Sequence, residues 1–269
     1  MEGNIFGGLE KFGFKTVIEE TGNIFEPAAN KKKQSSEAIE KQGFDINEYI
    51  YLKRFECPVC CKNFRNHVVK WSKMQLKGTD YDLRAIYEPI NPMFYDVIVC
   101  EYCGYSSLTE TFNKITDRQS ELILSEISPH FKSYEYPKEP DIDMVIDRYK
   151  LALLTSTIKK ANFGEKAYIC MKLTWLYRLK GGDPANEKLF AQFVLKGFAK
   201  ALAEEHPPIM GLEEATVLFI IAAFSKFVEQ HKSAMKILST LIVSKKASER
   251  LKNRARDLRN EIMALTENA

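Results

Sequence analysis

Apolar residues in the second half of the chain recur every three or four positions, the spacing that places them on one face of an α-helix. Gly181-Gly182 and Pro207-Pro208 interrupt this pattern, because paired glycines and prolines end helices. The pattern predicts helices over about 142–161, 165–180, 183–206, 212–229, 231–243 and from 247 onwards. Successive helices joined by short turns are typical of tetratricopeptide-like stacks of helical hairpins. No second copy occurs at a period of about 34 residues, so an irregular helical bundle fits nearly as well.

A different pattern occupies residues 46–135. Tyr49–Phe55, Phe64–Trp71 and Met93–Val99 are rich in aromatic and β-branched residues, which predicts three strands. Thr116 and Gln119 have the spacing of a capping box, which predicts the start of a short helix. The predicted fold class is therefore α+β, with a small β module at 46–135 and an α-helical domain at 142–269.

Residues 1–45 have little core-forming pattern, and we expect a flexible arm and linker there. Phe6, Leu9 and Phe12 could share one helical face, but four glycines within residues 3–13 oppose a stable helix. We interpret the opening as a short arm that docks on the body of the protein. A peptide that recruits a partner is the alternative interpretation.

Composition and charge exclude several classes of function. The chain has 269 residues, of which 45% are hydrophobic and 28% charged, and its net charge is +3. This length suits two modest domains, and the near balance of charge argues against a general polycation for nucleic acid. The sequence opens without a secretory signal, and no apolar run approaches the roughly 20 residues that a membrane span needs. We therefore expect a soluble cytoplasmic protein with no membrane partner.

Four of the six cysteines form two C-x-x-C pairs. In a reducing compartment such pairs indicate metal binding or redox chemistry rather than disulfides. Zn²⁺ prefers four soft ligands in a tetrahedron, and each C-x-x-C supplies two thiolates from one tight turn. We predict one zinc ion per chain in a zinc-ribbon-like module, held by Cys57, Cys60, Cys100 and Cys103. Residues 61–99 then form an insertion between the two turns. A dithiol redox pair and buried free thiols are the alternatives.

Four thiolates close the coordination sphere of the metal, so the predicted zinc is structural and the protein is expected not to be an enzyme. Cys61 directly follows Cys60, and adjacent cysteines bind one tetrahedral ion awkwardly, so we interpret Cys61 as a bystander. Cys170 lies among large apolar residues and is expected in a core. The four histidines are scattered, and no small-molecule substrate is evident.

Basic and aromatic residues follow the first cysteine pair. Exposed rings beside a basic groove can stack on bases, so this face is a candidate for binding nucleic acid. The candidate contacts are Lys62, Arg65, Lys70 and Trp71, with Phe64 and Tyr51 as further aromatic rings. The alternative interpretation is that these cations offset the negative charge of a metal ion bound by four thiolates.

Two further segments are dense in polar groups. The insertion carries Asp82, Arg84, Tyr87 and Asn91, which we interpret as a hydrogen-bond network that packs the insertion, with a recognition site as the alternative. The last predicted helix carries seven basic residues from 245 to 259. We expect a solvated surface on that helix, with a contact to RNA or to an acidic protein as the alternative.

Several motifs together resemble the bacterial family called domain of unknown function 2225. They are Phe6–Glu10, Cys57-Pro58-Val59-Cys60, Asp82-Leu83-Arg84, Tyr87, Asn91-Pro92, Phe94–Val97, Cys100–Tyr105, Ile127-Ser128-Pro129, Arg148–Leu153 and Trp175–Arg178. The resemblance implies a cytosolic zinc-binding protein with a tetratricopeptide-like helical half. On this resemblance Cys57, Cys60, Cys100 and Cys103 are the metal ligands, and no enzymatic activity is implied. Cys61 departs from the family's pattern, which has another residue after the first pair.

Three functions remain for this sequence. The first is a non-enzymatic adaptor whose helical half binds a protein partner. The second is a nucleic-acid-binding accessory protein that uses the basic face of the zinc ribbon. The third is an enzyme or thiol switch at the C-x-x-C pairs. We expect the first.

Overall fold

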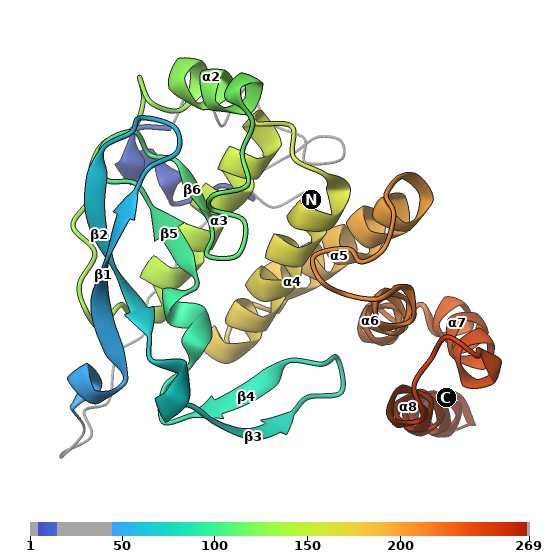
Figure 1. Cartoon of the computed structure of the whole chain (residues 1–269). Helices are drawn as coiled ribbons and strands as arrows, with labels where there is room; N and C mark the ends of the chain where they lie inside the picture. Colours follow the sequence, from blue (N-terminus) through green and yellow to red (C-terminus); the bar gives the residue numbers. More distant parts are fainter. Residues whose placement is uncertain (1–4, 15–44, 268–269) are drawn as a thin grey trace. The chain divides into compact units, whose positions relative to one another are not determined.

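The computed structural model describes residues 5–14 and 45–267 (Figure 1). These residues form two compact units. The first unit comprises the described residues up to Leu76 together with Tyr87–Ala161. The second unit comprises Lys77–Ile86 together with the described residues from Asn162 onwards. Within the described ranges, no helix is both long and apolar enough to cross a membrane.

The strands of the first unit form two separate antiparallel hairpins (Figure 1). In one, β1 (Ile50–Glu56) pairs with β2 (Asn63–Val69), with Phe55 opposite Phe64. In the other, β5 (Val97–Val99) pairs with β6 (Ser106–Leu108). Because the two hairpins share no ladder of backbone hydrogen bonds, side chains must hold them together.

Helix α3 (Ile142–Ile158) forms the centre of the first unit. It packs against β5 and β6, and α2 (Asp117–Glu126) packs against it. Every residue from 145 to 156 is buried, which is typical of a helix enclosed on all sides. The predicted domain division assigned this helix to the helical domain, whereas the structure groups it with the strands.

Residues 5–14 pack into the first unit around a 3-10 helix, Leu9–Phe12. Leu9 and Phe12 are fully buried, and the backbone N–H of Lys132 donates to the Phe12 carbonyl at 2.8 Å. The Lys150 ammonium donates to the Gly7 carbonyl at 2.6 Å. This segment therefore docks on the body of the protein, while residues 15–44 of the predicted flexible linker lie outside the described residues.

Five consecutive helices make up most of the second unit. They are α4 (Phe163–Lys180), α5 (Pro184–Glu204), α6 (Glu214–Phe227), α7 (His231–Val243) and α8 (Glu249–Glu267). Each packs against the next along the chain, and α6 also contacts α8 (Figure 1). The unit also includes most of a third hairpin, in which β3 (Gln75–Thr79) pairs with β4 (Ala85–Glu88).

The α+β fold class is as predicted, and so is the capping box at the start of α2, in which the Thr116 and Gln119 side chains each bond to the other's backbone. The strand predicted over Met93–Val99 is wrong in its first half. Asn91 accepts a hydrogen bond from the Met93 backbone N–H at 3.1 Å, and Pro92 follows it, which starts a 3-10 helix over Pro92–Tyr95. The strand predicted to end at Trp71 stops at Val69, because Trp71 begins another 3-10 turn.

Candidate metal centre

Each C-x-x-C pair forms the turn of a hairpin. Cys57 follows β1 and Cys60 precedes β2, while Cys100 follows β5 and Cys103 precedes β6. All four cysteines therefore belong to the first unit. The sequence predicted two turns of this kind, and the structure places them at the ends of two independent hairpins.

The two turns have the same backbone hydrogen bonds. The Cys57 carbonyl accepts from the Cys61 N–H at 2.9 Å, and the Cys100 carbonyl accepts from the Gly104 N–H at 3.0 Å. The Cys57 N–H donates to the Lys62 carbonyl at 3.0 Å, and the Cys100 N–H donates to the Tyr105 carbonyl at 2.9 Å. Two copies of one turn thus face each other.

The four sulfur atoms lie close enough to share one ion. All of them are within 4.8 Å of one another, with Cys57 and Cys103 Sγ 3.6 Å apart and Cys60 and Cys100 Sγ also 3.6 Å apart. Four thiolates at about 2.3 Å from a tetrahedral zinc ion would be separated by about 3.8 Å. Cys57 and Cys100 are fully buried, Cys103 nearly so, and Cys60 is half-buried. The donor set and its spacing therefore fit a tetrahedral metal ion.

The sulfurs also perturb one another strongly. Hydrogen bonds from Cys103 and Cys57 lower the pKa of the Cys100 thiol to about 2. The interaction with Cys100 raises the pKa of Cys57 to about 12, and it also raises the pKa of Cys103. Negative charge held by one sulfur thus opposes ionisation of its neighbours. A bound cation removes this conflict, because it stabilises all four thiolates together.

Aromatic side chains join the two hairpins beside the sulfurs. Phe112 lies between them, with ring centroids 5.9 Å from Phe55, 6.0 Å from Phe64 and 5.1 Å from Tyr105. Phe55 and Phe64 stack across β1 and β2 at 5.8 Å. Phe64 is only 3% exposed, so its suggested role in stacking on nucleic acid is wrong. The sequence could not show this, because the ring that covers Phe64 comes from Phe112.

Cys61 lies outside the sulfur cluster and is exposed. It occupies the same position in its turn as Gly104 does in the other, and both have positive φ, 58° at Cys61 and 75° at Gly104. A non-glycine residue is disfavoured in this conformation because its Cβ crowds the following carbonyl. The bystander interpretation of Cys61 agrees with this placement. Cys170 is buried in α4, where burial raises the pKa of its thiol.

The four candidate nucleic-acid contacts are spread along the first hairpin rather than gathered. Lys62 and Arg65 are exposed, and Trp71 is 64% exposed. Lys70 donates to the Asn47 carbonyl at 2.9 Å. Lys62 and Lys70 are eight residues apart along an extended chain, which is roughly 25 Å. The Trp71 ring is in edge contact with Tyr87 at 5.7 Å.

Part of the polar cluster in the insertion packs within the second unit. Asp82 is 1% exposed, accepts from the Trp175 indole N–H at 3.0 Å and forms an ion pair with Arg178 at 2.8 Å. Burial alone would lower the pKa of Arg178, but Asp82, Tyr81 and Glu187 together outweigh burial and raise the pKa. Arg84 pairs with Asp80 at 2.6 Å. These contacts agree with the packing interpretation for Asp82 and Arg84, whereas Tyr87 and Asn91 belong to the first unit.

The geometry defines a class of protein: an α+β chain in which two hairpin turns bring four cysteines together. Over residues 50–262 the chain matches the family described as "Uncharacterized protein conserved in bacteria (DUF2225)". The chain therefore belongs to this family, and the resemblance read from its motifs is confirmed. Searches among curated proteins and among solved structures gave no match.

Proposed function

We propose that Cys57, Cys60, Cys100 and Cys103 bind one structural Zn²⁺ ion. The observation that supports this proposal is that four sulfur atoms lie within 4.8 Å of one another at the tips of two separate hairpins. Sulfur-only sites of this geometry are typical of zinc and of iron–sulfur centres, and a single closed tetrahedron favours zinc. With all four positions taken by thiolates, the metal has no site for water or substrate. Its role is to fasten the hairpins.

We place the protein in the cytoplasm, acting as a non-enzymatic adaptor whose helical unit binds a protein partner. None of the six cysteines forms a disulfide in the structure, which suits a reducing compartment. Helices that each pack against the next leave long surfaces on both sides, and stacks of this kind commonly bind proteins. The metal site contributes rigidity to the first unit rather than chemistry.

Binding of nucleic acid is the second candidate function. Tyr51, on β1, is 45% exposed, and Trp71, which follows β2, is 64% exposed; Lys62 and Arg65, before and within β2, are exposed as well. Single-stranded nucleic acid binds to such combinations through stacking and phosphate contacts. This function predicts that affinity falls steeply with salt and is lost when Lys62 and Arg65 are replaced by glutamate.

Metal analysis of the reduced, purified chain tests the zinc proposal. We expect one zinc per chain, lost in Cys57→Ser and Cys103→Ser and retained in the matched control Cys61→Ser. Loss of the ion should release the hairpins while the far-ultraviolet helix signal mostly survives, because the five helices of the second unit contain none of the four ligands. Iron in place of zinc, or zinc retained by Cys103→Ser, would contradict the proposal.

Cross-linking in intact cells tests the adaptor role separately. Lysines on α7, such as Lys232 and Lys236, should cross-link to one recurrent protein, which the purified chain should bind at unchanged affinity after nuclease treatment. If the only partners recovered disappear with nuclease, the nucleic-acid function replaces the adaptor.

A further inference from the structure

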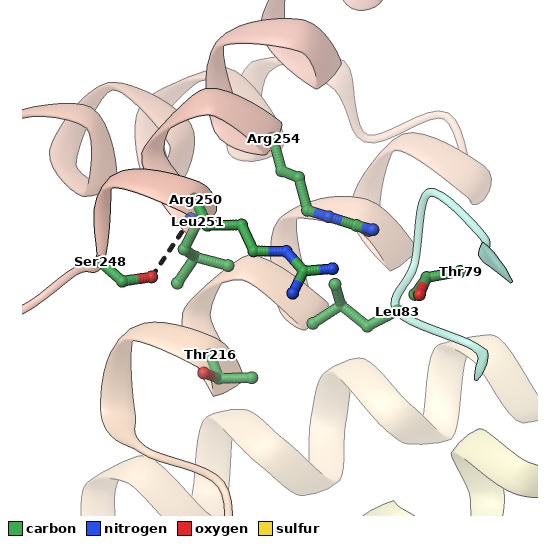
Figure 2. Close-up of a pocket in the computed structure, with 7 residues that line it drawn as sticks. All are labelled: Thr79, Leu83, Thr216, Ser248, Arg250, Leu251 and Arg254. Atoms are coloured by element: carbon green, nitrogen blue, oxygen red, sulfur yellow. Dashed lines mark hydrogen bonds between the residues drawn. The ribbon is translucent and has the colours of Figure 1, made fainter. Parts of the chain in front are cut away.

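A small pocket lies in the second unit, at the start of α8 (Figure 2). Its volume is about 180 Å³. Residues from the third hairpin, the first turn of α6 and the start of α8 line it: Thr79, Leu83, Thr216, Ser248, Arg250, Leu251 and Arg254. Sites for drug-sized ligands usually occupy about 300–1,000 Å³, so this pocket suits a single chemical group.

Two arginines give the pocket its charge. Arg250 and Arg254 are one turn apart on α8, and Figure 2 shows both side chains extending from the helix over the pocket. The Arg254 guanidinium donates to the Asp80 carbonyl at 3.1 Å, which fixes its position. Arg250 has no hydrogen-bond or ion-pair partner among the described residues. No carboxylate lines the pocket, so nothing in its walls offsets these charges.

This arrangement is electrostatically unfavourable for the helix itself. Like charges four residues apart destabilise a helix by about 0.2–0.5 kcal/mol, and a cation in the first turn opposes the positive end of the helix dipole. Arg250 is the second residue of α8, so both effects apply to it. An anion between the two guanidinium groups would reverse the sign of each effect.

Three hydroxyl groups add donors of a second kind. The Ser248 hydroxyl oxygen accepts from the Leu251 backbone N–H at 3.3 Å, which leaves its own O–H free to donate. Thr216 and Thr79 contribute hydroxyls from α6 and β3. Each arginine carries five N–H donors. The pocket thus offers many donors and two full positive charges in a space for one group.

We propose that this pocket binds a phosphoryl group. A phosphomonoester carries a charge of about −1.5 to −2 and three terminal oxygens, which matches two guanidinium groups and the surrounding hydroxyls. A carboxylate has a single charge and two oxygens and would leave donors unused. The group could be free phosphate or could belong to a phosphorylated protein segment. This site is independent of the metal centre, which belongs to the other unit.

Titration of the full chain with inorganic phosphate, followed by calorimetry and by amide chemical shifts, tests the proposal. We expect saturable binding that perturbs the amides of residues 248–254. Arg250→Gln should weaken binding about tenfold or more, because it removes charge-assisted hydrogen bonds. This variant should fold normally, since Arg250 is exposed and has no hydrogen-bond or ion-pair partner among the residues that the structure describes. Arg256→Gln, on the same helix but outside the pocket, is the charge-matched control and should bind as the native chain does.

Two further ligands separate the sources of the group. Acetate at the same ionic strength should bind at least tenfold more weakly than phosphate. A phosphoserine peptide that binds more tightly than phosphate, and loses that advantage in Arg250→Gln, identifies a protein-borne group; equal affinities identify free phosphate. Phosphate binding that survives Arg250→Gln, or acetate binding equal to that of phosphate, overturns the proposal.

Discussion

The paired turns at the candidate metal centre allow a direct test of backbone strain. Cys61 and Gly104 occupy equivalent positions with φ of 58° and 75°, but only Gly104 is a glycine. We predict that Cys61→Gly stabilises the first unit. Relief of the left-handed strain is worth about 1–2 kcal/mol, and the added freedom of glycine in the unfolded chain costs about 0.4–1 kcal/mol. At the midpoints of these ranges the net gain is about 0.8 kcal/mol, or an increase in Tm of about 2–3 °C.

The reverse substitution in the other turn should be costly. A Cβ added at Gly104 would lie 2.5 Å from the Phe131 ring, in addition to requiring a left-handed backbone. Overpacking typically costs about 1–3 kcal/mol, so Gly104→Ala should destabilise by about 2–5 kcal/mol in total. The opposite signs at equivalent positions make the pair of variants a sharper test than either alone.

Urea unfolding of the zinc-loaded protein, followed by zinc release and by amide hydrogen exchange in β1 and β2, measures both effects. The zinc content of Cys61→Gly should remain one per chain, since Cys61 lies outside the sulfur cluster. A zinc content below one in this variant would show that Cys61 is a ligand. Tolerance of Gly104→Ala would show that Gly104 does not have the left-handed backbone and the close approach to Phe131 on which the prediction depends.

Three further predictions concern the rest of the chain. Asp82→Ala should destabilise the second unit by about 2–4 kcal/mol in urea unfolding, because it leaves the Trp175 indole N–H and the Arg178 guanidinium without their buried carboxylate partner. The control Asp80→Ala, at a more exposed carboxylate, should cost about 1 kcal/mol or less. Phe12→Ala should cost about 3–5 kcal/mol and speed proteolysis of residues 5–14, while Leu124→Ala, at an exposed site, should change stability by less than about 0.5 kcal/mol. Burial raises the pKa of Asp147, so the folded state holds this proton more tightly than the unfolded chain does. The stability gained from the proton is complete below the ordinary pKa of 3.8 and is lost as pH rises through the raised pKa. Asp147→Asn should therefore remove this loss from a profile of unfolding free energy against pH.

Local rules predicted the parts of the structure that local interactions determine. The α2 capping box depends on residues three apart, and the helix starting at Pro184 depends on the adjacent Asp183, whose side chain accepts from the Asn186 N–H at 3.2 Å. The spacing of each C-x-x-C pair likewise fixes its own turn. These features could be read from the chain because each is completed within a few residues.

Features that depend on distant partners could not be predicted in this way. The assignment of α3 to the first unit follows from its contacts with β5 and β6. The apolar pattern of α3 shows that the helix is buried but does not show which elements bury it. Burial of Phe64 requires Phe112, and burial of Asp82 requires Trp175, 93 residues away. The pocket at Arg250 was visible in sequence only as one part of a basic helix, because its other walls come from β3 and α6.

The division of the chain between the two units has a consequence for its synthesis. The polypeptide passes from the first unit to the second at residue 77, returns at residue 87 and passes over again at residue 162. Leu83, in this excursion, packs against the apolar cluster formed by α6, α7 and α8. A ribosome that adds about 5–20 residues per second therefore exposes the Asp82 segment for roughly 5–20 s before Trp175 has been made. During that interval the proposed metal can already close the loop between the two cysteine turns, while Leu83 remains exposed because the helices that cover it have not been synthesised. A nascent chain halted near residue 161 should accordingly be a good substrate for chaperones even when the four cysteines hold the proposed metal ion.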